Sequence, residues 1–188
     1  YSPDVISFAR EKGYFDGVNK DFSFANAYAP LDFGARRYCE ARVWSYFNMF
    51  TARGNEFLPY ILGDTDTPMP LFVKPDRKIS VQDVKNAMRD HYEGTPLDIS
   101  KDFGAGPYHT PYRLSPLSFK VGDKEYFNER PISTQQSGFV FVAQMRSTLP
   151  DAIGGVLWFG TDDANMTVFT PVYCCTDKVP VCYSRVDG

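Results

Sequence analysis

Polar side chains gather at the ends of two predicted strands in the second half of the chain. Asn128 and Arg130 close one strand, and Thr134 and Gln135 open the next. Amide, guanidinium and hydroxyl groups thus lie in one short stretch, at strand ends where binding sites are often built. We expect these four residues to bind a substrate. The alternative is structural: a hydrogen bond that ends the strand, and a surface ion pair between Arg130 and Glu129.

The two histidines, His91 and His109, allow two interpretations. In the first, they join Glu93 in a metal site. In the second, which we favour, His91 places a positive charge at the end of a helix, where the helix dipole stabilises it, and His109 lies in a surface loop. The sequence has no phosphate loop, no dinucleotide fingerprint and no serine in a nucleophile elbow. We therefore expect no metal and no cofactor.

Four cysteines are present, and three of them lie near the end of the chain. Cys39 falls on a predicted amphipathic helix, where we expect a small buried apolar residue. Cys182 can pair with Cys174 or Cys175 across a proline-containing loop, which favours a periplasmic or secreted protein. Their spacing matches no standard zinc pattern. Free thiols and a cytoplasmic location are the alternative.

The composition narrows the class of protein. Hydrophobic residues make up 43% and charged residues 23% of the chain, close to the averages for globular proteins. The net charge is -3 and shows no basic stripe, so we expect no nucleic-acid partner. No apolar run reaches the ~18 residues of a membrane-spanning helix, so we expect no membrane partner. The aromatic share of 16% is typical of heavy aromatic packing or of a pocket walled by rings.

Helical periodicity dominates the first half of the chain. A short helix is predicted before Gly13, and a strong amphipathic helix over residues 35–51. Another is predicted over residues 80–92, where Ser80 and Asp83 form a variant of the capping box. The intervening residues 14–33 lack periodicity and are predicted to form a long ordered loop.

The apolar period changes to two in the second half. Residues 117–121 and 125–128 flank a predicted hairpin turn. Residues 139–145 are predicted to form a central strand buried on both faces, because both alternating sets of side chains are apolar. Residues 155–159 and 166–173 are predicted to pair in antiparallel fashion around a turn at Asp162 to Asn165.

These elements predict an α+β fold, in which a mostly antiparallel sheet carries helices on one face. We treat residues 1–188 as a single unit, mainly helical over 1–95 and mainly strand over 117–175. The sequence has no internal repeat. Residues 65–78 are the best candidate for a linker, because they are rich in turn-forming residues.

Several blocks of the sequence resemble one known family. The block from Tyr126 to Gln144 reads YFNERPISTQQSGFVFVAQ, and it is followed by IGGVLWFG from Ile153 and TVFTPVY from Thr167. Together the blocks cover most of the chain in one order. They resemble the dipeptidase A, or secernin-like, family of N-terminal-nucleophile cysteine peptidases. Further similar blocks lie upstream, at residues 28–34, 39–44, 81–84 and 91–95.

The resemblance implies a four-layer αββα sandwich and an enzyme that hydrolyses dipeptides. It implies a mature enzyme that begins with a catalytic cysteine, whose thiol attacks the peptide carbonyl while its own α-amino group acts as base. This chain begins with Tyr1, and none of its cysteines is N-terminal. We therefore expect an internal portion of a larger hydrolase that lacks the nucleophile and is inactive alone. Its expected partners are a short peptide substrate, the rest of its own polypeptide and further copies in a homo-oligomer.

Two other functions remain open at this point. One is an amidohydrolase that acts on N-acyl amides of the bile-salt or penicillin type. The other is a non-catalytic module that binds peptide or carbohydrate on exposed aromatic rings. A dipeptidase must bind an ammonium and a carboxylate, so acidic residues and arginine should line its cleft. Exposed rings in a row would favour the binding module.

Overall fold

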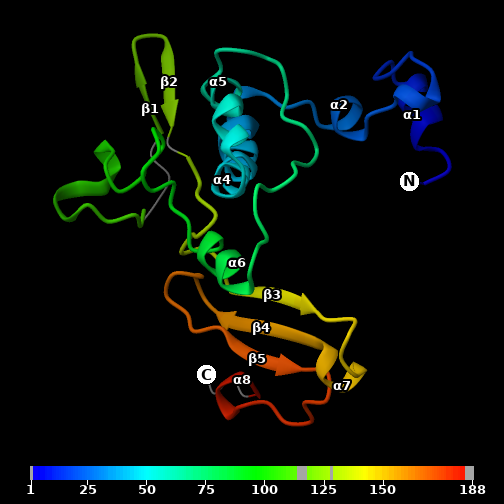
Figure 1. Cartoon of the computed structure of the whole chain (residues 1–188). Helices are drawn as coiled ribbons and strands as arrows, with labels where there is room; N and C mark the ends of the chain where they lie inside the picture. The colour runs from blue at the N-terminus through cyan, green and yellow to red at the C-terminus, as the bar shows by residue number, and fades with distance from the viewer. Residues whose placement is uncertain (1, 114–117, 128, 185–188) are drawn as a thin grey trace.

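The computed structural model describes residues 2–113, 118–127 and 129–184. Helices come first and strands follow, and the sheets in these ranges are antiparallel, which confirms the predicted α+β class (Figure 1). A group of helices occupies one end of the molecule, and a three-stranded sheet occupies the other (Figure 1). Within the described ranges, no helix is long and apolar enough to cross a membrane.

The N-terminal region packs around one tyrosine. Helix α1 (Val5–Glu11) is followed by Gly13 in left-handed backbone with φ +71°. The prediction of an unbroken loop over residues 14–33 is wrong, because the region contains the 3₁₀ turn η1 (Asn19–Asp21) and helix α2 (Phe24–Tyr28). The helix is too short to show periodicity, and ring contacts hold it instead. The aromatic rings that contact Tyr28 belong to Phe8, Tyr14, Phe22 and Phe24.

The predicted amphipathic helix at residues 35–51 is confirmed. It is a continuous stretch made of α3 (Phe33–Ala35), the π-helical turn η2 (Arg36–Glu40) and α4 (Ala41–Phe50). A 3₁₀ turn, η3 (Ala52–Phe57), and helix α5 (Leu58–Leu62) follow it. These helices pack together at one end of the molecule (Figure 1).

Trp44 of α4 lies at the centre of the helical core. Its side chain is fully buried, and its indole N–H donates to the Gly54 carbonyl oxygen at 3.0 Å. Position 54 requires glycine, because a Cβ there would lie 2.3 Å from the Cα of Asn48. The buried residues of this core are Ala41, Trp44, Tyr60, Ile61, Tyr92, Leu97 and Ile99.

Helix α6 (Val81–Ala87) begins with the predicted capping box. The Ser80 hydroxyl accepts from the Asp83 N–H, and the Asp83 carboxylate accepts from the Ser80 N–H. The helix ends at Ala87, five residues before the predicted end at Tyr92. The chain then turns, with Tyr92 in left-handed backbone at φ +64°, and continues into η4 (Phe103–Tyr108).

The strands form a hairpin and a separate sheet. Strands β1 (Ser118–Val121) and β2 (Lys124–Phe127) form the predicted hairpin. Strand β3 (Phe139–Met145) pairs with β4 (Gly155–Thr161), and β4 pairs with β5 (Thr170–Tyr173). The antiparallel pairing of β4 with β5 confirms the second predicted pairing, although β5 begins at Thr170, four residues after the predicted start. The short helices α7 (Asp151–Gly154) and α8 (Val181–Ser184) lie at the two ends of the β4–β5 unit.

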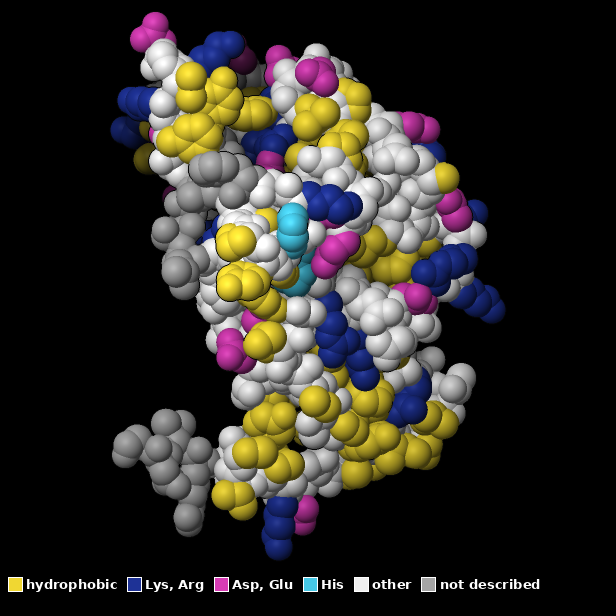
Figure 2. All heavy atoms as spheres, turned by 90° about the vertical axis from the view of Figure 1, so that its left-hand side faces the viewer, with side chains coloured by type: hydrophobic (Ala, Val, Ile, Leu, Met, Phe, Trp, Pro, Cys, Tyr) yellow, Lys and Arg dark blue, Asp and Glu magenta, His cyan; other side chains and the backbone are white. Residues whose placement is uncertain are grey.

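The prediction that residues 139–145 form a central strand buried on both faces is wrong. The strand order is β3–β4–β5, so β4 is central and β3 is an edge strand among the described residues. Val140 and Val142 are buried under α6, whereas Phe139, Phe141 and Met145 on the other face are 60%, 51% and 79% exposed. Figure 2 shows hydrophobic side chains gathered at the sheet end of the molecule. An apolar pattern cannot reveal which of two apolar faces has a cover.

Candidate functional site

The segment after β2 lines a small pocket. Arg130, Thr134 and Gln135, three of the four predicted binding residues, lie together there, and the fourth, Asn128, falls outside the described residues. The pocket volume is about 30 Å³, far below the ~300 Å³ of a small ligand site. It therefore has room for only one end of a substrate. Its lining is Tyr38, Ile99, Pro111, Arg113, Glu129, Arg130, Pro131, Thr134, Gln135 and Gln136.

Two of the charged groups in the pocket are already paired. Glu129 forms an ion pair with Arg37, and both side chains are largely buried, at 10% and 14% exposed. Arg113 forms an ion pair with Asp102 and also donates to the Ile99 carbonyl oxygen at 2.6 Å. Burial lowers the pKa of Arg37, and the nearby Tyr92 partly offsets this. The surface ion pair between Arg130 and Glu129 is therefore not formed, because Arg37 occupies the carboxylate.

Arg130 is the free cation of the pocket. Its side chain is exposed, and it forms no ion pair with any residue that the structure describes. The guanidinium lies over the Tyr38 ring, 5.9 Å from the ring centroid. Nearby, the Thr134 hydroxyl contacts the side-chain amide of Gln136, and Gln135 is exposed. Arg130 is thus available to bind an anionic group, since its planar guanidinium fits a carboxylate.

Tyr92 fixes the backbone of the pocket from inside the core. Its ring is fully buried and stacks on Trp44 at a centroid distance of 6.5 Å. Its hydroxyl donates to the carbonyl oxygen of Arg130 at 2.8 Å. Burial raises the pKa of Tyr92, and the charge of Asp90 raises it further. The phenol therefore remains a protonated donor over the physiological pH range.

Asp90 joins helix α4 to the segment that lines the pocket. Its carboxylate accepts from the Ser45 hydroxyl at 2.6 Å, and its backbone carbonyl accepts from the Ser133 N–H at 3.0 Å. Burial raises the pKa of Asp90 to about 6, although the Ser45 hydrogen bond opposes the rise. Asp90 therefore titrates closer to neutral pH than an exposed aspartate does.

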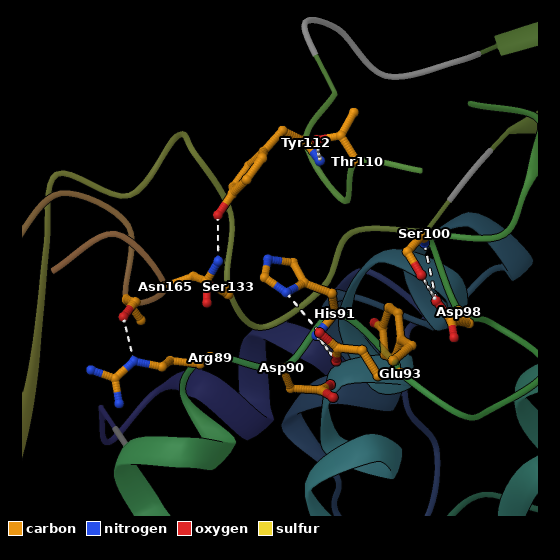
Figure 3. Close-up of polar contacts among 12 residues, drawn as sticks. Arg89, Asp90, His91, Glu93, Asp98, Ser100, Thr110, Tyr112, Ser133 and Asn165 are labelled. Atoms are coloured by element: carbon orange, nitrogen blue, oxygen red, sulfur yellow. Dashed lines mark hydrogen bonds and ion pairs between the residues drawn. The ribbon is translucent and has the colours of Figure 1, made fainter. Parts of the chain in front are cut away.

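Glu93 orients the imidazole of His91. One carboxylate oxygen accepts from the His91 backbone N–H at 2.7 Å, and the other lies 3.1 Å from His91 Nδ1 (Figure 3). Burial raises the pKa of Glu93, but its hydrogen bonds with His91 outweigh that effect and leave the pKa below its usual value. In the neutral imidazole, a carboxylate on Nδ1 favours the tautomer with its proton there, and Nε2 is then an acceptor.

A comparison with known protein families shows which family the chain belongs to. The model of the family described as Peptidase family C69 matches residues 1–188. The chain belongs to peptidase family C69. This confirms the resemblance to the dipeptidase A family.

Curated relatives of this C69 chain are named dipeptidases. The "Probable dipeptidase" of Salmonella dublin is 31% identical over 172 residues, which cover 92% of this chain and 34% of that protein. The "Probable dipeptidase B" of Lactococcus lactis subsp. lactis (strain IL1403) is 26% identical over 176 residues, which cover 93% and 32%. The "Dipeptidase A" of Lactobacillus helveticus is 28% identical over 145 residues, which cover 76% and 25%. The chain thus spans about a third or less of the length of these relatives. No solved structure matches it.

The residues of the alternative metal site, His91, Glu93 and His109, do not come together in the structure. His91 pairs with Glu93, while His109 Nδ1 lies 3.3 Å from the Ser100 carbonyl oxygen, in a different contact. No group of three metal-ligating side chains occurs within the described ranges. The favoured interpretation of His91 as a helix cap is wrong, because α6 ends at Ala87 and the His91 side chain is buried.

The cysteines of the C69 chain are exposed free thiols in the structure. The prediction that Cys39 is buried is therefore wrong: it lies on the outer surface of the helical stretch. Cys174 Sγ lies 3.6 Å from the Gly155 carbonyl oxygen, and Cys182 lies on α8. Pairing of Cys182 with Cys174 or Cys175 remains a prediction for an oxidising compartment.

Sequence reasoning missed several polar contacts beside the pocket. The predicted turn at Asp162 to Asn165 does contain an Asx hydrogen bond, from the Asn165 N–H to Asp163 Oδ1 at 3.3 Å. Sequence reasoning missed that the Asp163 side chain is 1% exposed and that the same oxygen also accepts from the buried Ser133 hydroxyl. It assigned no role to Tyr92. The available signal was the run from Asp90 to Glu93, in which ionisable side chains directly precede Gly94 in left-handed backbone.

Proposed function

We propose that the full-length protein is a cysteine dipeptidase and that this chain forms the pocket for the substrate's carboxylate end. Membership of peptidase family C69 supports the peptidase activity, and the names of the relatives support dipeptides as substrates. The observation that carries the proposal is the free guanidinium of Arg130 at the pocket. Dipeptides always present a carboxylate one peptide unit from the scissile bond, so a fixed cation there would align them for attack.

The backbone contacts of Arg130 support this role. The hydrogen bond from Tyr92 holds the Arg130 carbonyl in place, and Pro131 restricts the backbone of Arg130, the residue that precedes it. The competing carboxylate of Glu129 is engaged by Arg37. Arg130 therefore combines a fixed main chain with a guanidinium that binds no anion among the residues that the structure describes. Thr134 and Gln135 line the same pocket and supply the neighbouring polar groups.

The nucleophile in this proposal is a cysteine outside the chain. The full-length protein is an αββα sandwich, and the rest of its polypeptide covers the exposed face of the β3–β5 sheet. Three side chains of β3 on that face, those of Phe139, Phe141 and Met145, are apolar and more than half exposed, which supports a missing cover. A homo-oligomer is the other arrangement that would cover them. We propose an extracytoplasmic location if the C-terminal cysteines pair.

One observation favours a second function, a non-catalytic platform for peptide or carbohydrate. The rings of Phe139, Phe141 and Phe159 stack in a row on the same face, with centroid distances of 6.4 Å and 6.1 Å. Such a row can bind a sugar or peptide face. If these rings are buried in the full-length protein, the platform is excluded. If they remain reactive to solvent probes and bind an oligosaccharide, the platform is supported.

The dipeptidase proposal is tested with the full-length protein and three substrates. These are a dipeptide, the same dipeptide with an amidated C-terminus, and an N-acyl amino acid of the amidohydrolase type. We expect the dipeptide to be hydrolysed most efficiently. Arg130→Gln should raise its KM by about tenfold, the value of one charge-assisted hydrogen bond, and leave the KM for the amide unchanged.

Arg53→Gln is the matched control, because Arg53 is a 69% exposed arginine outside the pocket. It should leave all three reactions unchanged. Preference for the N-acyl substrate would indicate an amidohydrolase. Equal hydrolysis of the dipeptide and its amide, or an Arg130→Gln variant with unchanged KM, would contradict the assigned carboxylate pocket.

The 188-residue chain alone should not hydrolyse dipeptides. An N-terminal-nucleophile enzyme needs the thiol and the α-amino group on one residue, and loss of a covalent nucleophile costs orders of magnitude in rate. The comparison is between this chain, the full-length protein and the full-length protein with its N-terminal cysteine changed to alanine. Turnover by the short chain at the full-length rate would overturn the proposal.

A further inference from the structure

A closed circuit of contacts lies beside the pocket, and Figure 3 shows its members Asp90, His91, Tyr112, Ser133 and Asn165. The Tyr112 ring packs edge-on against the His91 ring at 5.8 Å, and its hydroxyl accepts from the Asn165 side-chain amide at 2.5 Å. The Asn165 N–H donates to Asp163 Oδ1 at 3.3 Å, and the Ser133 hydroxyl donates to the same oxygen. The circuit closes through the Ser133 N–H and the carbonyl of Asp90, the neighbour of His91. We call these six residues the polar circuit.

Two side chains of the polar circuit carry buried polar atoms without a partner. His91 Nε2 and Asp163 Oδ2 have no hydrogen-bond partner among the described residues. The side chains are 2% and 1% exposed. Figure 3 shows the His91 ring between Glu93 and Tyr112, with its second nitrogen on the side of Tyr112 and Asn165. Buried polar groups are normally satisfied, so two such atoms in one circuit point to a ligand.

The charge of Asp163 decides the chemistry of that ligand. Within the part of the chain that the structure describes, Asp163 forms no ion pair. Arg89, a cation on the adjoining segment, instead donates to the carbonyl oxygens of Ala164 and Thr167. A buried carboxylate without a counter-charge is costly, and a neutral water does not remove that cost. A cation that also donates hydrogen bonds satisfies both the charge and the lone pairs.

The hydrogen-bonding pattern matches a primary ammonium. Glu93 holds the proton of His91 on Nδ1, so Nε2 presents a lone pair, and Asp163 Oδ2 presents another. An ammonium group has three donors in a small volume. A guanidinium is planar and larger, and a quaternary amine has no donor. Two acceptors with one negative charge therefore fit –NH₃⁺ best.

The polar circuit and the carboxylate pocket are built from the same segments. Pro111 and Arg113 line the pocket, while Tyr112 between them belongs to the circuit. Pro131 and Thr134 line the pocket on either side of Ser133. The two sites thus share two segments of the chain, and a dipeptide that joins them spans about 7 Å. Asn165 is exposed and Tyr112 half-buried, so their hydrogen bond lies at the outer side of the circuit.

We infer that the polar circuit binds a primary ammonium group, the α-ammonium of a dipeptide substrate, with Asp163 as its counter-charge. The inference rests on the proposed dipeptidase function and names the second end of the substrate. Two acids near the pocket are already neutralised: Glu129 pairs with Arg37, and Asp102 pairs with Arg113. Asp90, the other buried acid of the polar circuit, has no ion pair among the described residues, but its carboxylate accepts from Ser45. Asp163 is the acid of the circuit with a buried oxygen that has no hydrogen-bond partner among the described residues.

The direct test uses the full-length protein labelled with ¹⁵N-histidine. Methylammonium chloride is titrated while the Nε2 resonance of His91, assigned by its loss in His91→Gln, is followed by NMR. We expect a saturable shift of that resonance. Potassium chloride and tetramethylammonium chloride should not produce it, because neither cation donates hydrogen bonds. This measurement on the unchanged protein requires no variant to fold.

Asp163→Asn and Asp162→Asn form a matched pair of variants. Asp163→Asn keeps the side-chain shape but removes the buried charge, and should weaken methylammonium binding by about tenfold or more. Asp162 is the exposed neighbour with φ +70°, a conformation that asparagine also adopts, so Asp162→Asn should bind normally. No shift in the unchanged protein, an equal shift with potassium, or unchanged binding by Asp163→Asn would overturn the inference. An Nε2 that already carries a proton donated to Asp163 would overturn it as well.

Measurements of hydrolysis test this inference separately from the proposed function. We expect the full-length protein to prefer a dipeptide over its N-acetylated form, and Asp163→Asn to lose that preference. Dipeptide hydrolysis without methylammonium binding at His91 would refute the ammonium site and leave the dipeptidase function standing. Methylammonium binding without dipeptide hydrolysis would refute the function and leave an amine site.

Discussion

The hydroxyl of Tyr92 donates a hydrogen bond to the carbonyl oxygen of Arg130 at 2.8 Å. Tyr92 is fully buried and adopts φ +64°, a conformation that costs a non-glycine residue of the order of 1 kcal/mol. Packing against Trp44 maintains it. A strained core residue thus fixes the main chain of the residue assigned to substrate binding, which links the helical core to the pocket.

Tyr92→Phe should therefore weaken substrate binding without altering the fold. The change removes the hydroxyl and leaves the Arg130 carbonyl without its donor, which should lower the free energy of unfolding by about 1 kcal/mol. The KM for dipeptides should rise several-fold while kcat changes less. Urea unfolding and steady-state kinetics of the full-length protein measure these effects.

Tyr46→Phe is the matched control for this prediction. Tyr46 is a half-buried tyrosine of α4 whose ring packs on Phe50 at 4.9 Å. It should leave KM unchanged. An equal rise in KM for both variants would show that Tyr92 acts through general stability and does not position Arg130.

Breaking the ion pair between Arg37 and Glu129 should strongly destabilise the folded protein. Both side chains are largely buried, so Arg37→Met leaves an unpaired carboxylate and should cost about 3 kcal/mol of unfolding free energy. The double variant with Glu129→Gln should recover most of that loss. A double-mutant cycle in urea measures the coupling, and additive losses would contradict a direct pair.

Local patterns were enough to predict much of the framework. Ser80 and Asp83 indicate the start of α6 because a capping box uses only neighbouring residues. The period of two predicts the β4–β5 pairing for the same reason. The three pocket residues Arg130, Thr134 and Gln135 were found because they lie close in the sequence and at strand ends.

The remaining features depend on contacts between distant parts of the chain. Ser133 and Asp163 are thirty positions apart; Ser133 precedes β3 and Asp163 follows β4, and the pairing of these two strands brings the segments together. The exposed face of β3 depends on what else covers the sheet. Helix α2 is too short for periodicity and is held by rings from other segments. Such tertiary determinants leave no local pattern.

Thiol counting tests the cysteine prediction. If the protein is exported, Cys182 should pair with Cys174 or Cys175, so the denatured chain without reductant should contain two free thiols. The exposure of all four thiols supports their access to an oxidant. Cys182→Ser should then raise the free thiols among the remaining three cysteines to three. Four free thiols in the unchanged exported protein would refute the pairing.

Asp90 should make the free energy of unfolding decrease as the pH rises through the weakly acidic range. Burial raises its pKa from 3.8 to about 6, so the folded state holds this proton more tightly than the unfolded state does. The associated stabilisation is fully present below pH ~4 and is lost as pH rises through ~6. From the pKa difference, the loss is about 3 kcal/mol.

Asp90→Asn isolates this effect, because an amide oxygen still accepts from Ser45 but does not titrate. Glu93 and Asp98, whose pKa values are lowered, act in the opposite direction. The stabilisation that they contribute is lost as pH falls. The difference between the unchanged protein and the variant cancels their contribution. Urea unfolding of the full-length protein at pH 4, 5, 6 and 7 should therefore show the variant gaining relative stability as pH rises. A difference that stays constant over this range would mean that Asp90 is not the titrating group.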